Sequence, residues 1–216
     1  MRILDLGMIS YHEALSVQEE VLKKRIEGGT PDTLIVLEHF PVVTFGRTFD
    51  RSDILDDGFF TSRGFDIVHT TRGGSITCHM PGQIVVYPVI GLAAYGKNIS
   101  RYIDMLQDAA VSALAKVGVT ASGDPGRRGV WVSGKKIAFI GIKVTKWIAY
   151  HGIAINFNND LSAFSRINPC GEPDIKVTSA GRVLGGVIDM AEARSAVKAA
   201  FTGVFAAKKE PCGTCG

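Results

Sequence analysis

The spacing of apolar residues along the chain predicts three long helices. The first begins at Ser10, which forms a capping-box pattern with Glu13, and its apolar residues keep a helical period as far as Gly28. Asn98 caps a second helix that reaches Gly118. The third helix begins with the acidic pair Asp189 and Glu192 and carries Val197, Phe201, Val204 and Phe205.

Short β-branched runs between these helices predict strands. The runs are TLIVLEHF, PVVTFGR, two stretches within GFDIVHTTRGGSITCHMPGQIVVYPVI, the hairpin GVWVSGKKIAFIGIKV and WIAYHGIAINFN. Strands mixed with long helices, without strict β-α-β alternation, indicate an α+β fold with a mixed, mainly antiparallel sheet.

Composition is typical of one globular domain. The 216 residues are 46% hydrophobic, and we place the domain at residues 1–207, with 208–216 as a disordered tail. No apolar run is long enough to span a membrane, and the N-terminus has no signal-peptide pattern. The net charge of +3 comes from dispersed residues, so no nucleic-acid partner is predicted. We expect a cytoplasmic protein with no bound metal or cofactor.

Four cysteines are too few for a disulfide scaffold, so free thiols are expected. Cys212 and Cys215 form a C-x-x-C pair in the tail, which by itself is weak evidence for half a zinc site or a disulfide. Cys170 lies between Pro169 and Gly171, and a cysteine in such a tight loop is either a small packing residue or an accessible nucleophile.

Adjacent lysines in the predicted hairpin face opposite sides of a strand. If Lys135 is solvated, Lys136 points inward beside Ala138 and Ile140, and a buried lysine is costly unless it has a partner or a task. A solvated Lys136 remains the alternative.

Two further stretches combine glycine with histidine. In RGGSITCHMPGQ, residues 72–83, glycines permit close approach of a ligand to the backbone, although a bulge with a structural His79 is the alternative. In YHGIAINFN, His151 and Gly152 begin an apolar strand, and taken in isolation this stretch favours a structural histidine with a glycine needed for the turn.

The sequences of these stretches and their order along the chain resemble those of the lipoyl(octanoyl) transferase family over residues 11–205. The stretches are HFPVVTFGR, RGGSITCHMPGQIVVYP, GKKIAFIGIKV, YHGIAINFNNDLSAFSRINPCG and DIKVTSAGR. The resemblance implies the fold of biotin- and lipoate-protein ligase catalytic domains. It also implies transfer of an octanoyl group from octanoyl-acyl carrier protein, through an enzyme cysteine, to a lysine of a lipoyl domain. The implied acceptors are the lipoyl domains of 2-oxoacid dehydrogenases and the glycine cleavage H protein.

The resemblance also implies roles for individual residues. Cys170 is the implied nucleophile, and Lys136 is the implied residue that favours its thiolate and moves protons. The implied acyl-binding residues are Arg72, Gly73, Gly74, Ser75, Ile76, Thr77, Cys78, His79, Phe139, Ile140, Gly141, Gly152, Ile153 and Ala154.

General chemistry supports the same assignment. Thioester exchange between thiols needs no ATP, and the loops at Gly73–Gly74 or 169–171 offer amide donors for an oxyanion. Ala138, Ile140, Ile153 and Ile155 offer apolar walls for the chain.

Two residues depart from the family pattern. Cys78 stands where an aromatic residue is usual, and Met80 stands where glycine is usual, so we expect Met80 to narrow or reshape the acyl pocket. Cys78 beside His79 is a second nucleophile candidate, ranked below Cys170 because no lysine is matched to it.

Two other functions remain open from the sequence. An ATP-dependent lipoate or biotin ligase shares the implied fold, although GDPGRRGV, residues 123–130, is better interpreted as a loop before a strand than as a nucleotide-binding loop. A non-catalytic binder of acylated carrier proteins is the other alternative, and it has no need of Cys170 together with Lys136.

Overall fold

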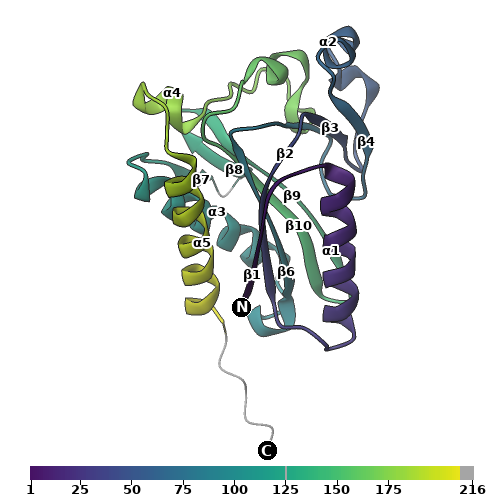
Figure 1. The fold of residues 1–216 in the computed structure, drawn as a ribbon, viewed down its shortest axis with the longest axis vertical. Coiled ribbons are helices and arrows are strands. Elements are labelled where there is room, and N and C mark those ends of the chain that lie inside the picture. The colour runs from purple at the N-terminus through teal and green to yellow at the C-terminus, as the bar shows by residue number, and fades with distance from the viewer. Residues whose placement is uncertain (125, 210–216) are drawn as a thin grey trace, which may run out of the picture.

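The computed structural model describes residues 1–124 and 126–209. It contains two sheets and five α-helices (Figure 1). The larger sheet has the order β1 (Arg2–Ile9), β2 (Thr33–His39), β6 (Gln83–Gly91), β10 (Ile148–Asn156), β9 (Lys135–Thr145), β8 (Arg127–Val132) and β7 (Ser122–Asp124). The smaller sheet has the order β4 (Asp66–His69), β3 (Val42–Phe45) and β5 (Ile76–His79). The helices are α1 (Tyr11–Ile26), α2 (Asp57–Ser62), α3 (Ile99–Lys116), α4 (Ala180–Leu184) and α5 (Met190–Ala207).

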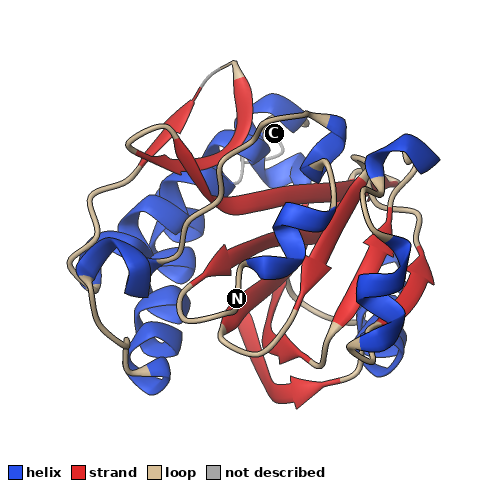
Figure 2. Cartoon of the chain, turned by 90° about the horizontal axis from the view of Figure 1, so that it is seen from above, coloured by secondary structure: helices blue, strands red, loops and turns tan. Residues whose placement is uncertain are grey.

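Helices cover both faces of the larger sheet (Figures 1 and 2). The apolar faces of α3 and α5 pack on one side, where Phe201 and Phe205 are fully buried. The apolar face of α1 packs on the other side, against residues such as Leu37 and Tyr150. Strands β2, β6 and β10 are buried along their whole length, which explains why their sequences are nearly continuous apolar runs.

The predicted helix starts are confirmed. Ser10 and Glu13 form a complete capping box at α1, and the side chains of Asn98 and Asp189 accept hydrogen bonds from the first-turn amides of α3 and α5. The predicted α+β class and mixed sheet are also confirmed. Only the β1–β2 and β3–β4 pairs are parallel, and the other strand pairs of the described residues are antiparallel.

Some features were not predicted. The first strand, β1, has mixed polarity and its register with β2 shifts between Asp5 and Met8, where Gly7 has a φ of 61°, so no regular alternation marks it. Within the predicted loop, Ser122–Asp124 form β7, which pairs antiparallel with β8 (Arg127–Val132). The C-x-x-C pair lies outside the described residues, and the domain boundary at 207 stays a prediction. No helix in the described part of the chain is long and apolar enough to cross a membrane.

The smaller sheet packs against one end of β9 through a separate apolar cluster. Val43, Phe45 and Ile76 from this sheet meet Phe139 of β9 and Phe164, and the rings of Phe139 and Phe164 stack with centroids 4.9 Å apart. This contact sets the smaller sheet and the loops that follow it beside the edge of β9.

Gly152 lets the central strands approach each other, and its replacement by alanine tests that constraint. A Cβ atom at this position would lie 2.2 Å from the Val86 carbonyl oxygen and 2.7 Å from Cδ of Pro88, both on β6. We expect Gly152→Ala to lower the free energy of unfolding by about 1–3 kcal/mol, measured by guanidinium denaturation. Gly203→Ala is the matched control, because nothing lies within 4 Å of its new methyl group and α5 should gain up to about 1 kcal/mol. Equal stability of the two variants would contradict this account.

Candidate active site

The structure brings Lys136 and Cys170 together. The Lys136 Nζ atom lies 3.5 Å from the Cys170 Sγ atom, although 34 positions separate the two residues in sequence. Lys136 is 1% exposed and Cys170 is half-buried. A cation at this distance favours the thiolate form of a cysteine, which is the nucleophilic form.

Lys136 is buried, as predicted, and Lys135 is exposed at the hairpin turn. Alternation along β9 is not the whole cause, because residues 136–140 are all buried and the register with β8 shifts between Val130 and Trp131. Gly129 on β8 makes room for Lys136, since a Cβ at that position would lie 2.6 Å from the lysine Cε atom. Its ammonium group lies 5.2 Å from the ring centroids of both Trp131 and Phe139.

The turn η4 (Pro169–Gly171) presents Cys170 in a left-handed conformation, with a φ of 64°. Such a conformation is uncommon for a residue with a Cβ atom and needs support from its surroundings. Asp53 supplies part of that support, because its carbonyl oxygen accepts a 2.8 Å hydrogen bond from the Asn168 amide and its carboxylate accepts a hydrogen bond from the Ser75 hydroxyl. The sequence analysis missed Asp53, which no local pattern marks.

Arg72 fixes the glycine loop that precedes β5. Its buried guanidinium donates to the Thr44 and Ser75 carbonyl oxygens at 2.6 and 2.9 Å, and to the Gly73 carbonyl oxygen at 3.1 Å. No carboxylate of the described residues pairs with it, and burial lowers its pKa. The same loop is tied to β9, because the Gly73 amide donates to the Ile142 carbonyl oxygen at 2.9 Å.

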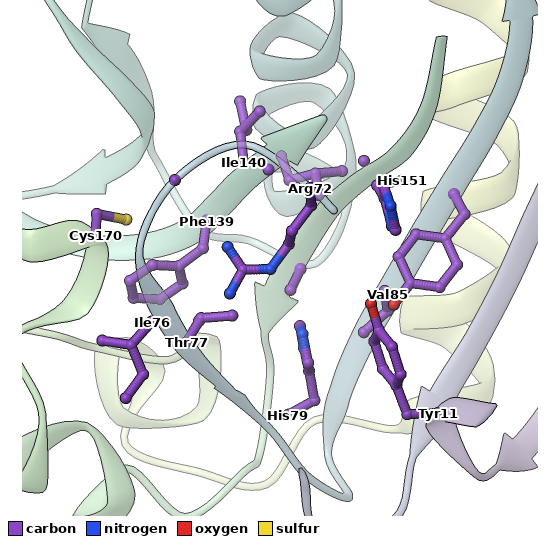
Figure 3. A pocket seen from close by; sticks show the side chains of 16 residues that line it. Tyr11, Arg72, Ile76, Thr77, His79, Val85, Phe139, Ile140, His151 and Cys170 are labelled. Carbon is purple, nitrogen blue, oxygen red and sulfur yellow. The ribbon is translucent and has the colours of Figure 1, made fainter. Parts of the chain in front are cut away.

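A narrow cavity runs inward from Cys170 between the two sheets (Figure 3). Its volume is only about 30 Å³ when measured as the space open to the centre of a water-sized sphere. Its lining is Tyr11, Arg72, Gly74, Ile76, Thr77, His79, Val85, Tyr87, Phe139, Ile140, Gly141, His151, Gly152, Ile153, Ala154 and Cys170. Figure 3 places Cys170 at one end of this cavity, with its sulfur directed inward, and His151 and Tyr11 at the other end.

The lining includes most of the predicted acyl-binding residues. Three of them lie elsewhere. Gly73 lines a second hollow, and the Ser75 hydroxyl donates a hydrogen bond to the Asp53 carboxylate. Cys78 is fully buried on the opposite face of β5 from Thr77 and His79. The expectation that Ala138 and Ile155 line the pocket was also wrong, because both belong to the core beneath α3 and α5. Met80 packs in the cluster of the smaller sheet and is not part of the cavity lining.

Four lining residues were missed as site residues: Tyr11, Val85, Tyr87 and His151. Val85 and Tyr87 come from β6 and Tyr11 from the start of α1, so their sequence positions give no sign that they converge. For His151, the sequence taken alone favours a structural role. What distinguishes His151 is its backbone conformation, a φ of 56° inside a strand, which the sequence does not reveal.

The inner end of the cavity is polar but uncharged. Burial lowers the pKa of His151 to about 3 and that of His79 well below its usual range. His39 does not line the cavity but packs against the rings of Tyr11 and His79, and burial lowers its pKa to about 4. Burial also raises the pKa of Tyr11 to about 12. These imidazoles and the phenol are therefore neutral around pH 7.

A second, wider hollow meets the narrow cavity at Cys170, and we call it the wide groove. Its volume on the same measure is about 460 Å³, and it is lined by Lys136 and Cys170 together with Arg127, Arg128 and Glu172. A further hollow with Arg47 and Lys143 shares Arg128 with it. Cys170 thus borders two hollows, one narrow and mainly apolar, the other wider and more polar. Nowhere in the described residues do three His, Cys, Asp or Glu side chains gather in a metal-binding arrangement.

Comparison with known proteins defines first the class of protein. The model of the lipoyl protein ligase A/B catalytic domain family matches residues 10–202. The octanoyltransferase of Geobacter metallireducens is 39% identical over 93% of this chain and 92% of its own, and that of Pelobacter propionicus is 40% identical over 95% of each. The chain therefore belongs to the lipoyl(octanoyl) transferase family.

Solved structures show the same fold at low sequence identity. A lipoate-protein ligase A bound with ATP superposes with a TM-score of 0.80 and 18% identity, covering 95% of this chain and 85% of that one. The biotin protein ligase from Aquifex aeolicus in complex with biotin and ATP gives 0.57 and 13%, covering 96% and 72%. The implied fold of biotin- and lipoate-protein ligases is thereby confirmed.

The buried histidines should make stability fall in mild acid. Between its folded pKa of about 4 and an unfolded value of about 6.5, His39 binds a proton only in the unfolded chain, so unfolding becomes easier as the pH falls. His39→Gln removes this titration. As the pH falls from about 6 to 4.5, we expect the free energy of unfolding to fall less steeply in the variant than in the wild-type protein. The two slopes should differ by up to about 1.4 kcal/mol per pH unit. Denaturation curves at several pH values measure both slopes, and parallel slopes would refute the assignment.

Proposed function

We propose that the protein transfers an octanoyl group from octanoyl-acyl carrier protein to a lysine of a lipoyl domain through a thioester on Cys170. The observation that carries this proposal is the 3.5 Å pair of Lys136 and Cys170 at the junction of a narrow, mainly apolar cavity and a wider groove lined by Arg127 and Arg128. Membership of the lipoyl(octanoyl) transferase family supports the reaction class.

In the first step, the Cys170 thiolate attacks the thioester carbonyl of the donor. The new bond joins its sulfur to the acyl carbon, and the bond from that carbon to the donor sulfur breaks. The Lys136 ammonium gives its proton to the departing thiolate, so the donor leaves as a thiol and the lysine becomes a neutral amine. No ATP is consumed, because one thioester replaces another.

In the second step, the amine of the acceptor lysine attacks the acyl-Cys170 thioester. Neutral Lys136 takes a proton from the attacking nitrogen, an amide forms, and Cys170 leaves as a thiolate beside the restored ammonium. The pair thus returns to its starting state, with one octanoyl group and one proton moved in balance.

Backbone amides near the sulfur are suited to hold the negative oxygen that develops in both steps. The Gly73 amide already donates to Ile142, and the Gly171 amide donates to the Asn168 carbonyl oxygen at 3.0 Å. We therefore propose that the backbone amides of Gly74 and Cys170 donate hydrogen bonds to the oxyanion. This narrows the sequence-based expectation, which included all the glycines of both loops.

The two hollows divide the substrate between them. The narrow cavity suits the acyl chain, since Ile76, Phe139 and Ile153 supply apolar walls. The wide groove suits the donor arm and then the acceptor lysine. Its Arg127 and Arg128 complement an acidic carrier protein and the phosphate on its prosthetic arm. The free thiols Cys78 and Cys170 are compatible with a reducing cytoplasm.

An ATP-dependent ligase is disfavoured by two observations. A ligase that forms an adenylate has no need of a thiol beside its lysine. The described residues of GDPGRRGV belong to the paired strands β7 and β8 or adjoin them, and none of them opens a helix as a phosphate loop does. If transfer assays required ATP and free octanoate, the protein would instead be an ATP-dependent ligase.

Intact-mass measurement tests the acyl-enzyme. After incubation with octanoyl-acyl carrier protein and no ATP, we expect the protein to gain one octanoyl group that hydroxylamine removes. Cys170→Ser should gain no hydroxylamine-sensitive group. Cys78→Ser should behave as the unchanged protein, because complete burial raises the pKa of the Cys78 thiol and keeps it protonated. Wild-type protein that stays unmodified would disprove the mechanism.

Lys136→Met tests the role of the ammonium group while keeping the volume of the buried side chain. We expect the rate of acyl-enzyme formation to fall by about a hundredfold or more, because the thiolate loses its cation and the leaving thiol loses its proton donor. Lys143→Met, on the same strand but partnered with the Tyr150 ring at 5.7 Å, is the control and should change this rate far less. Equal rates in both variants would exclude Lys136 from catalysis. Rapid-quench mass spectrometry supplies the rates.

A further inference from the structure

The inner end of the narrow cavity contains a polar side chain that the proposed reaction does not use. His151 is 1% exposed, and neither of its ring nitrogens has a hydrogen-bond partner in the described part of the protein. It lines the cavity and lies at the end opposite Cys170 (Figure 3). Buried polar atoms are nearly always satisfied in folded proteins, so a partner for His151 has to come from solvent or from a ligand.

The backbone places His151 in this position at some cost. Its φ of 56° is unusual inside a strand for a residue with a Cβ atom. The conformation is held from behind, where its amide donates to the side-chain carbonyl oxygen of Gln18, a residue that is itself 1% exposed. Tyr150 and Tyr87 enclose the ring at centroid distances of 5.0 and 6.2 Å. The imidazole is therefore held at the cavity end by packing, with its nitrogens left for a guest.

The chemistry of this end is that of neutral hydrogen-bonding groups. Burial and the charges of Arg72 and Lys143 keep the pKa of His151 at about 3, so the ring offers one donor and one acceptor at working pH. Tyr11, also at this end, keeps its hydroxyl proton because burial raises its pKa to about 12, and its hydroxyl group already has the side chain of Thr70 as a hydrogen-bond partner. A hydroxyl group matches this set, whereas a methyl group does not.

We propose that His151, together with Tyr11, forms a polar end of the narrow cavity that selects the terminus of the bound acyl chain. It disfavours methyl-ended chains long enough to reach it and accepts chains of the same length that end in a hydroxyl group. The inference rests on the proposed function, since it takes the cavity to be the acyl site. It identifies a specificity determinant and an additional class of ligand, the ω-hydroxy acyl chain.

The contrast with a purely steric end makes the proposal testable. In a cavity that simply runs out of space, affinity stops rising at one chain length whatever the chemistry of the wall. With a polar end, the limit depends chiefly on the two imidazole nitrogens of His151, because an alkyl group that covers them leaves a buried donor and a buried acceptor without a partner.

Titration calorimetry with straight-chain acids of six to twelve carbons, and with the matching acids that carry a terminal hydroxyl, measures this directly. For the wild-type protein we expect affinity for methyl-ended acids to rise roughly fourfold per added CH₂ and then to stop. In His151→Leu, of similar side-chain volume, the rise should continue for at least one more carbon. Preference for the hydroxyl-ended acid should fall by about tenfold. Tyr11→Phe, which only removes an oxygen, should shift the limit in the same direction if His151→Leu does not fold.

Thr77→Val is the matched control. The Thr77 hydroxyl is also buried without a partner and also lines the cavity, but Figure 3 places it between Cys170 and the inner end. Its removal should change affinity for all chains alike and leave the limiting length where it was. An unchanged limit in both His151→Leu and Tyr11→Phe would overturn the proposal in favour of a steric end.

The same titrations separate this proposal from the proposed function. Wild-type protein that binds the acids with the expected pattern but forms no acyl-enzyme would support the polar end and overturn the transfer reaction. Wild-type protein that forms the acyl-enzyme with the same limit in every variant would do the reverse. Absence of binding by any acid would overturn the polar end, while the intact-mass measurement alone would still decide the transfer reaction.

Discussion

The proposed active site depends on a lysine side chain, that of Lys136, held inside the protein. Removal of its amine head group from water is costly, and the ring faces of Trp131 and Phe139 offset that cost only in part. Among the described residues, the hydrogen-bond contact of this amine is with the Cys170 sulfur at 3.5 Å. Gly129 has no side chain and therefore leaves room for the lysine. These features support the proposal that the lysine and the cysteine act as a pair.

The pair also requires that two sheets hold a fixed position relative to each other. Lys136 belongs to the larger sheet, whereas the turn with Cys170 is tied through Asp53 and Ser75 to the smaller one. Stacking of Phe139 on Phe164 joins these parts directly beside the pair. Packing between the sheets thus has a catalytic consequence, because a shift of about 1 Å would separate the sulfur from the ammonium group.

Sequence reasoning succeeded where a local period carries the information. Strand alternation correctly placed Lys136 inside and Lys135 outside, and the same rule, applied to β5, would have separated Cys78 from Thr77 and His79. It failed where distant segments converge. Tyr11 precedes the cavity residues of β10 by more than a hundred positions, and no single-sequence pattern joins them. Residues such as Asp53 act through backbone contacts that depend on loop geometry, which residue types do not specify.

The two cysteines in the described part of the chain show how strongly the reactivity expected of a thiol depends on its position in the fold. Cys78 has a histidine as its sequence neighbour, which on paper is the better arrangement for a nucleophile, yet strand geometry turns the two side chains to opposite faces. Its thiol is fully buried in an apolar cluster, and burial raises its pKa. Cys170 has only proline and glycine beside it, but the fold supplies the lysine and two routes of access. Reactivity follows the charge and the opening around the sulfur, and both are set by residues remote in the chain.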